Sequence, residues 1–266
     1  TYKNTNGNWV FPEDVEKINE DFFQISTNDR VIKGPIESMS KSKKNVIDPE
    51  TIINNFGADS ARWFMLSDSP PEKDINWSES GIQGSWKICQ KIWTLVIEHK
   101  QYLKIEKGIE NYSHNATDLM FLVNQNLQSV TKGIEKFQMN VAIAKIYEMV
   151  NGISKFKVVH ENDDFALGNA LKILIRIIEP MVPHLAEECW AMTGSHSSLI
   201  DEPWPIVNEL FLEKNDSVVV IQINGKRRGE IVIKRNATEE EVKNEIKSIK
   251  NINDALTKKN ILRSVY

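Results

Sequence analysis

The sequence predicts a mainly α-helical protein, in which an antiparallel helix bundle lies between an N-terminal segment of loops and short strands and a small α+β module. Three observations support this fold class. Apolar residues recur at helical spacing from Ser78 to about Thr193. The prolines on either side of Trp204 then interrupt this pattern. Beyond them, two runs rich in Val and Ile flank Asn224-Gly225, a dipeptide typical of a tight β-hairpin turn.

The size and composition are those of an ordinary globular protein with two or three compact units. The chain has 266 residues, of which 41% are hydrophobic and 26% are charged. No apolar run is long enough to cross a bilayer, and the N-terminus does not resemble a secretory signal. We therefore expect a cytoplasmic protein without a membrane partner. Because the chain does not begin with Met, we also expect it to be part of a longer protein.

The cysteines and histidines predict no bound metal. Cys89 and Cys189 lie far apart in sequence, and each sits in an apolar helical pattern that predicts a buried thiol. None of the five histidines has a neighbour at metal-ligand spacing. They are His99, His114, His160, His184 and His196.

The N-terminal region is expected to form loops and short strands up to about residue 45. Turn residues separate short apolar pieces such as 22–26 and 30–32. No first strand or glycine turn of a nucleotide-binding domain is present, so this region is expected to be the end of a domain.

Two short helices are expected next. Asp48-Pro49-Glu50 is a helix start, because it combines an N-cap acceptor with a proline at the first helical position. This helix should run to about Asn55, where Gly57 can end it. We expect Asp59 to cap the second helix, which stops before Pro70-Pro71.

The bundle is predicted from four series of apolar residues, each of which forms one stripe on a helix. The series are Cys89, Ile92, Val96 and Leu103; Leu119, Val123, Leu127, Val130 and Ile134; Ile143, Ile146, Val150 and Ile153; and Leu167, Ala170, Leu171, Leu174, Ile175 and Ile178. We expect Asn140 to cap the third helix. Pro180 and Pro183 should end the fourth helix before a short helix over 184–192. Five tryptophans in or beside these patterns are expected to be core residues. They are Trp63, Trp77, Trp86, Trp93 and Trp190.

The C-terminal module is predicted to contain a hairpin and a helix. Strands over 217–223 and 229–233 flank the Asn224-Gly225 turn. Residues 238–241 read Thr-Glu-Glu-Glu, a capping box that opens a helix to about Ile249. Residues 261–266 are expected to form a last short strand.

Charge is distributed unevenly along the chain. From Lys214 onward there are 12 Lys and Arg against 7 Asp and Glu, a net charge of +5, whereas the preceding residues carry a net −9. The net charge of −4 argues against indiscriminate nucleic-acid binding. A basic terminal module on an acidic body favours a polyanionic partner, although a merely lysine-rich surface would give the same count.

The most informative segment is Ser38-Met39-Ser40-Lys41-Ser42-Lys43-Lys44-Asn45, which precedes the helix start at Asp48. A loop of small polar residues around a fixed lysine, between a strand and a helix, can close over a triphosphate. Lys41 would place positive charge where a leaving pyrophosphate gains negative charge. Ser40 and Ser42 would offer hydroxyls and backbone N–H groups to phosphate oxygens. On composition alone, a solvated basic loop is the commoner interpretation.

This segment resembles the Lys-Met-Ser-Lys-Ser motif of class I aminoacyl-tRNA synthetases, with Ser38 in place of the first lysine. The resemblance covers most of the chain, in the order of the family. The further similar segments are Asp48-Pro49, 56–62, 74–82, 137–140 and 180–190. Residues 218–229 are similar to the C-terminal hairpin of bacterial leucyl members. The chain therefore resembles the C-terminal portion of the leucyl-tRNA synthetase family.

The resemblance implies three domains. Residues 1–76 would be the end of the catalytic domain, with the ATP loop and the stem-contact helices. Residues 77–205 would be a helical bundle of the anticodon-binding type, and residues 214–266 a small α+β tRNA-binding domain. The remainder of the catalytic domain would lie in an N-terminal part of the same enzyme, so this chain alone is expected to be inactive.

The resemblance also implies an activity and its partners: ATP and leucine would form leucyl-adenylate, and the leucyl group would pass to leucine tRNA. Lys41 would be catalytic, and the ATP contacts would come from Ser38, Met39, Ser40, Lys41 and Ser42. Lys43 or Lys44 would be the lysine to supply the charge missing at Ser38. Mg²⁺ would accompany ATP in the complete enzyme, and no metal is expected to bind this chain itself.

The residues expected to contact tRNA are Lys226, Arg227, Arg228, Lys258, Lys259 and Arg263. At most two of the three hairpin residues should face the RNA together, because successive residues of a strand face opposite ways.

Two other functions stay open at this point. One is a stand-alone tRNA-binding protein with a decayed ATP loop, which Ser38 favours and the intact Lys41-Ser42 opposes. The other is an isoleucyl or valyl synthetase, against which the hairpin around Asn224-Gly225 is the main argument.

Overall fold

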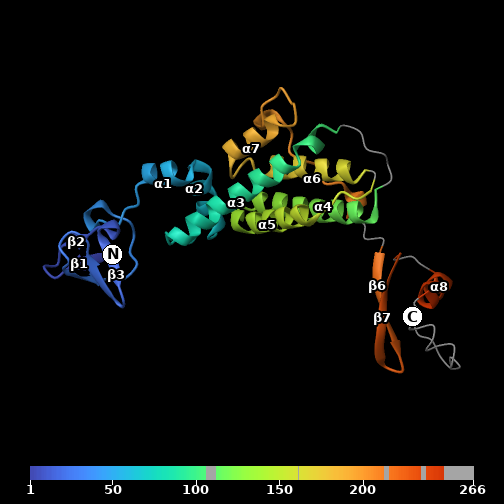
Figure 1. The fold of residues 1–266 in the computed structure, drawn as a ribbon, viewed down its shortest axis with the longest axis horizontal. Coiled ribbons are helices and arrows are strands. Elements are labelled where there is room, and N and C mark those ends of the chain that lie inside the picture. The colour runs from blue at the N-terminus through green and yellow to red at the C-terminus, as the bar shows by residue number, and fades with distance from the viewer. Residues whose placement is uncertain (106–111, 161, 213–215, 235–237, 249–266) are drawn as a thin grey trace.

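The fold consists of three structural units that follow one another along the chain. A computed structural model describes residues 1–105, 112–160, 162–212, 216–234 and 238–248. Figure 1 shows a small N-terminal β-sheet, a helical bundle, and a hairpin with one helix. The sheet and the hairpin lie at opposite ends of the bundle. The mainly α-helical class predicted from the sequence is confirmed.

The N-terminal sheet has five short antiparallel strands in the order β2-β1-β5-β4-β3. Their bounds are Tyr2–Asn4 (β1), Trp9–Val10 (β2), Val15–Ile18 (β3), Asp21–Gln24 (β4) and Arg30–Lys33 (β5). Strands β4 and β5 fall on the two apolar pieces singled out in the sequence. Strand β1 has no alternation of apolar and polar residues that would predict a strand. It forms by pairing with β5, where Lys3 lies opposite Ile32.

Helices α1 (Pro49–Phe56) and α2 (Ala58–Ser67) connect the sheet to the bundle. The predicted cap of α1 is confirmed, since the Asp48 carboxylate accepts hydrogen bonds from the backbone N–H groups of Glu50 and Thr51. The predicted cap of α2 is wrong. Gly57 ends α1 and is itself the N-cap of α2, so Asp59 already lies in the first helical turn. Its carboxylate accepts instead from the backbone N–H of Leu185, at 2.7 Å.

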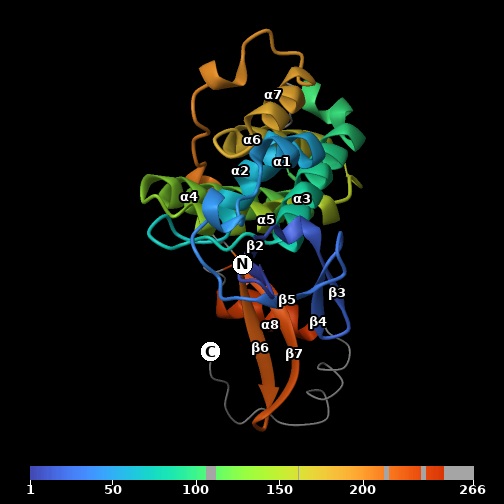
Figure 2. The same ribbon diagram turned by 90° about the vertical axis from the view of Figure 1, so that its left-hand side faces the viewer.

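Five helices form the bundle. They are α3 (Glu79–Glu98), α4 (His114–Glu135), α5 (Met139–Lys155), α6 (Asp163–Ile178) and α7 (Pro183–Ala191). In Figures 1 and 2, α6 lies between α7 on one side and α4 and α5 on the other. The apolar stripes predicted from the sequence meet in one core, to which α2 contributes the fully buried Trp63. The Trp63 indole N–H lies 3.3 Å from the Tyr147 hydroxyl, and the two rings meet edge to face.

The tryptophan prediction is only partly right. Trp63 and Trp190 are buried in the core, and Trp77 is half-buried against Phe64. Trp86 and Trp93 are 39% and 36% exposed, because both lie at the outer border of the apolar stripe of α3.

The predicted cap of α5 is also wrong. Helix α4 ends at Glu135, and Phe137 just beyond it lies in the left-handed region, at a φ of 56°. The N–H of Gln138 then donates back to the carbonyl of Gly133 at 2.7 Å. This closed turn makes Gln138 the N-cap of α5, and it provides no side-chain cap. Asn140 therefore lies inside the first turn of the helix.

The C-terminal unit contains β6 (Asp216–Ile223), β7 (Lys226–Lys234) and α8 (Glu239–Ser248). Asn224 and Gly225 both have positive φ, as the predicted turn requires. Thr238 and Glu241 form the predicted reciprocal capping box. The last predicted strand, 261–266, lies outside the described residues. Within the described ranges, no helix has the combination of length and apolar content that crossing a bilayer requires.

A buried carboxylate ties the start of α4 to the start of α6. Asp163 is fully buried and accepts hydrogen bonds from Ser113 Oγ (2.5 Å) and from the backbone N–H groups of Val159 (3.0 Å) and His160 (2.9 Å). Burial raises the pKa of Asp163, but these hydrogen bonds lower it more, and the resulting pKa lies below the usual value. A lowered folded-state pKa stabilises the fold above the unfolded-state pKa of about 4, and this contribution is lost as the pH falls through the folded-state pKa.

We therefore expect Asp163→Ala to lower the free energy of unfolding by about 3 kcal/mol near neutral pH, because the hydrogen bonds from Ser113 Oγ and from the N–H groups of Val159 and His160 are lost, at about 1 kcal/mol each. At about pH 3 the difference from the wild type should shrink, because the carboxyl group is then largely protonated in the unfolded state, whose pKa is about 4. Denaturant titrations at both pH values measure this. The control is Asp164→Ala, since within the described residues the Asp164 carboxylate accepts a hydrogen bond only from the adjacent Phe165 N–H. Equal losses for both variants would contradict the assignment.

Candidate functional site

The loop singled out in the sequence is a compact turn between β5 and α1. Lys41–Lys43 form one turn of 3₁₀ helix, with Ser40 extended before it and Lys44 in the left-handed region after it. The hydroxyls of Ser40 and Ser42 lie 2.8 Å apart. Ser38, Met39, Lys41 and Ser42 are exposed and Ser40 is half-buried, so all five predicted ATP contacts lie together on one accessible loop.

Asn45 closes this loop through its side chain. Its amide oxygen accepts from the backbone N–H of Ser40 at 2.7 Å. Its amide nitrogen donates to the carbonyls of Glu37 (3.3 Å) and Ser38 (3.2 Å). Sequence analysis placed Asn45 in the motif but could not predict its role. A side chain that forms hydrogen bonds with the backbone five to eight residues earlier leaves no periodic pattern in the sequence.

The three lysines of the loop have different surroundings. The Lys43 ammonium donates to the Glu37 carboxylate, and this hydrogen bond holds the pKa of Glu37 below its usual value. The Lys44 ammonium lies 5.2 Å from the centre of the Phe11 ring. Lys41 is exposed and forms no ion pair with any residue in the described part of the chain. Of the three, Lys41 is therefore the lysine that has neither a carboxylate partner nor an aromatic ring beside its ammonium in the described part of the chain.

The basic hairpin has an irregular return strand. Ile221 pairs with Gly229, whereas Gln222 pairs with Arg227, so Arg228 is an extra residue at a β-bulge. Arg227 and Glu230 form an ion pair at 2.6 Å. Residues three apart in a regular strand face opposite sides, and the bulge brings these two to the same side. The regular alternation expected from the sequence therefore does not hold at this position.

The predicted tRNA contacts fall into two groups. Lys226, Arg227 and Arg228 are exposed on the hairpin. Helix α8 covers one face of the hairpin, where Ile221, Ile231 and Val242 are buried together. Lys258, Lys259 and Arg263 lie outside the described residues.

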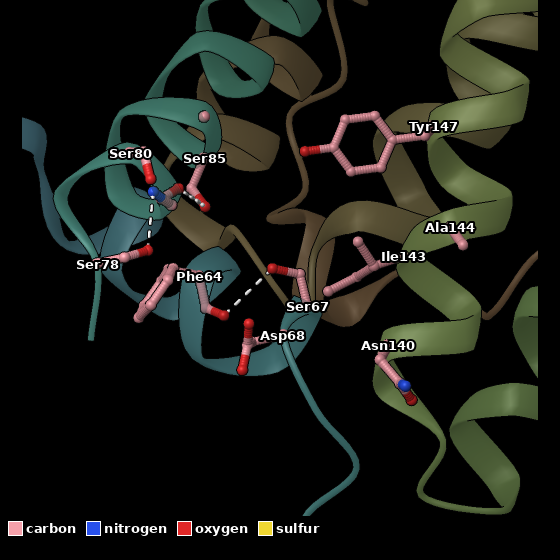
Figure 3. A pocket seen from close by; sticks show the side chains of 12 residues that line it. Phe64, Ser67, Asp68, Ser78, Ser80, Ser85, Asn140, Ile143, Ala144 and Tyr147 are labelled. Atoms are coloured by element: carbon pink, nitrogen blue, oxygen red, sulfur yellow. Dashed lines mark hydrogen bonds between the residues drawn. The ribbon is translucent and has the colours of Figure 1, made fainter. Parts of the chain in front are cut away.

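A polar pocket of about 390 Å³ lies where α2, α3 and α5 meet (Figure 3). Serine hydroxyls, Asp68, Asn140 and the Tyr147 hydroxyl line it beside the Phe64 ring. None of the sequence-predicted site residues lines it. Sequence reasoning missed this pocket because its walls come from three separate helices and share no motif.

The thiols and carboxylates offer no metal site in the part of the chain that the structure describes. Cys189 is buried, as predicted, while Cys89 is half-buried. Burial raises the pKa of Cys89 to about 11 and that of Cys189 to about 12, so both thiols stay protonated near neutral pH.

Comparison with protein families gives two matches. The model for the anticodon-binding domain of tRNA ligases matches residues 118–256, about half of the chain. The model for class I tRNA synthetases of the isoleucine, leucine, methionine and valine group matches residues 18–78. The second match contains the loop around Lys41 and both helices that follow it.

Individual relatives extend this similarity over the whole chain. A leucine–tRNA ligase of Parvibaculum lavamentivorans is 37% identical over 272 residues, which cover 100% of this chain and 31% of that protein. One of Allorhizobium ampelinum is 39% identical, covering 94% of this chain and 30% of that protein. The chain thus spans about 30% of the length of the curated relatives it matches.

A solved structure is similar as well. The chain resembles the Agrobacterium radiobacter K84 agnB2 LeuRS, crystallised as a ternary complex with tRNA and LeuAMS. The TM-score is 0.63 and the sequence identity 27%, over 86% of this chain and 29% of that chain.

The Asn45 contacts lead to a test of the loop that needs no substrate. Asn45→Asp should keep an acceptor for the Ser40 N–H but lose both donors to the carbonyls of Glu37 and Ser38, whereas Asn45→Ala loses all three bonds. At about 1 kcal/mol per hydrogen bond, amide exchange at Ser40 should quicken by about tenfold or more in Asn45→Ala and less in Asn45→Asp. Nuclear magnetic resonance measures this exchange. Unchanged exchange in both variants would mean that Asn45 does not hold the loop.

Proposed function

Since this chain belongs to the class I tRNA ligases of the leucine type, we propose that it supplies the ATP-contacting loop and the tRNA-binding surfaces of a leucine–tRNA ligase. The observation that carries this proposal is the similarity to leucine–tRNA ligases over the whole chain, together with an accessible loop on which Lys41 has no carboxylate partner among the described residues. The proposed protein is cytoplasmic, and the rest of its catalytic domain belongs to the same enzyme.

The proposed reaction has two steps. A carboxylate oxygen of leucine attacks the α-phosphorus of ATP, the bond to the β-phosphate oxygen breaks, and pyrophosphate leaves. A hydroxyl of the terminal adenosine of leucine tRNA then attacks the leucyl carbonyl, and AMP leaves with the bonding electrons. The first step places new negative charge on the departing pyrophosphate, so a fixed cation there lowers the barrier.

Lys41 is the cation that we assign to this role. The charge of Lys43 is paired with Glu37, and the Lys44 ammonium lies beside the Phe11 ring, whereas the Lys41 ammonium has neither kind of contact among the described residues. Ser38, Met39, Ser40 and Ser42 would contact ATP through hydroxyls and backbone N–H groups on the same turn. Mg²⁺ would arrive with ATP as part of the substrate, and we assign no metal ligand to this chain.

The tRNA contacts that we propose begin with the hairpin. Lys226, Arg227 and Arg228 are exposed on a strand whose turn is tight, so they would meet phosphates without ordering a flexible segment. Lys258, Lys259 and Arg263 are proposed as further phosphate contacts because of their charge. The ternary complex of the similar LeuRS contains tRNA, which is consistent with an RNA partner here.

In the complete ligase, Lys41→Ala should lower kcat for adenylate formation by about 10²–10³-fold, the usual cost of removing one transition-state charge partner. Ser38→Lys should change kcat far less, because position 38 already lacks a lysine. The assay is leucine-dependent exchange of pyrophosphate into ATP. If both substitutions are equally harmful or equally silent, Lys41 does not have the role assigned to it. A wild-type enzyme without leucine-dependent exchange would instead support a tRNA-binding protein without ligase activity.

Replacing Arg227 and Arg228 together with Ala should weaken tRNA binding and reduce the slope of log affinity against log salt by about 1. Two phosphate contacts would reduce it more, but the ion pair with Glu230 already compensates part of the Arg227 charge. Glu230→Gln is the matched control and should strengthen binding, since it frees Arg227. A salt titration of tRNA binding measures all three proteins. Unchanged slope and affinity in the double variant would leave these arginines as solvated surface residues.

A further inference from the structure

Two charged side chains of helix α2 form hydrogen bonds with the turn between α6 and α7. The Asp59 carboxylate accepts from the Leu185 backbone N–H at 2.7 Å and lies 2.9 Å from His184 Nδ1. The Arg62 guanidinium donates through Nε to the Met181 carbonyl at 3.0 Å and through Nη2 to the Pro180 carbonyl at 2.7 Å. We call this set of contacts the α2 clamp.

Each charge of the clamp matches the helix end that it contacts. Helix α7 has no side-chain cap of its own, because its N-cap is Val182. Asp59 therefore caps it from another helix, where a negative charge is favourable. Arg62 contacts carbonyls just beyond the end of α6 at Ile178, where a positive charge is favourable. The three contacts to backbone atoms, those to Leu185, Met181 and Pro180, fix both the position and the rotation of α2 against this turn.

The clamp and the core hold α2 along the same side. Asp59, Arg62 and Trp63 lie at positions i, i+3 and i+4, which share one face of a helix. Trp63 is fully buried in the bundle core, and Asp59 is only 12% exposed. Helix α2 appears beside α6 and α7 in Figure 2, in agreement with these contacts.

Through the α2 clamp and Trp63, the segment that carries the ATP loop is attached to the bundle. The chain runs from Lys41 through the loop and α1 directly into α2, with Gly57 between the two helices. Any change in the angle of α2 would therefore move the ATP loop relative to the bundle, most of which matches the anticodon-binding domain of tRNA ligases.

We propose that Asp59 and Arg62 are positioning residues, which hold the ATP loop in register with tRNA bound to the bundle. This inference rests on the proposed function. Adenylate formation without tRNA does not need the register, whereas transfer to tRNA does. Misplacing a reacting group by about 1 Å can cost about 100-fold in rate.

The test compares two assays in the complete ligase. In Asp59→Ala and Arg62→Ala, leucine-dependent pyrophosphate exchange without tRNA should stay within about twofold of the wild type, while kcat for transfer of leucine to tRNA falls by about 10- to 100-fold. KM for tRNA should change little, because the tRNA-binding surfaces themselves are intact. A role in folding alone would reduce both activities together, in proportion to the enzyme lost.

Two further variants serve as controls. Asp59→Asn retains an oxygen acceptor for the Leu185 N–H and should transfer leucine nearly as fast as the wild type. His184→Ala removes only the exposed histidine of the clamp and should be silent in both assays. Equal losses of exchange and transfer, or no loss of transfer, in the alanine variants of Asp59 and Arg62 would overturn the proposal. Failure of the proposed function is recognised separately, because the wild-type enzyme would then show no leucine-dependent exchange.

Discussion

The insertion of Trp63 into the bundle core is the contact on which the arrangement of the other parts depends. Helix α2 follows the loop and α1 in the chain, yet the indole of its Trp63 is fully buried among residues from the bundle helices. Burial of so large a side chain contributes several kcal/mol, more than any surface ion pair in the described chain can supply. The loop that carries Lys41 is therefore fastened to the bundle by apolar packing, and the polar contacts of Asp59 and Arg62 set the angle.

The two candidate functional regions use backbone irregularity in different ways. In the loop, Asn45 replaces a regular hydrogen-bond ladder and leaves Lys41 exposed. In the hairpin, the bulge at Arg228 brings Arg227 and Glu230 to one side of the strand. Both regions keep positive charge accessible on a short rigid turn, which suits phosphate contacts that are made without much ordering of side chains.

Sequence reasoning predicted the elements whose signals are local. The apolar stripes of α3 to α6, the Asn224-Gly225 turn and the cap at Asp48 each depend on residues close together in the chain. Sequence reasoning failed for features that depend on contacts between distant segments of the chain. Strand β1 exists because of β5, Asp59 caps a helix more than a hundred residues away, and Arg228 forms a bulge that depends on its partner strand. For the candidate site, the motif indicated the loop and its lysine, whereas the Asn45 contacts and the pairing of Lys43 with Glu37 required coordinates.

Native-state hydrogen exchange of α2 tests the central claim most directly, because it reports whether this helix opens with the bundle or alone. If Trp63 makes α2 part of the bundle core, the amides of α2 should exchange with the same opening free energy as those of α5 and α6. Their exchange should also respond to denaturant with the same slope, since all three helices would open in one cooperative step. Exchange of α2 at a much lower opening free energy, independent of α5 and α6, would show that the loop segment is only loosely attached.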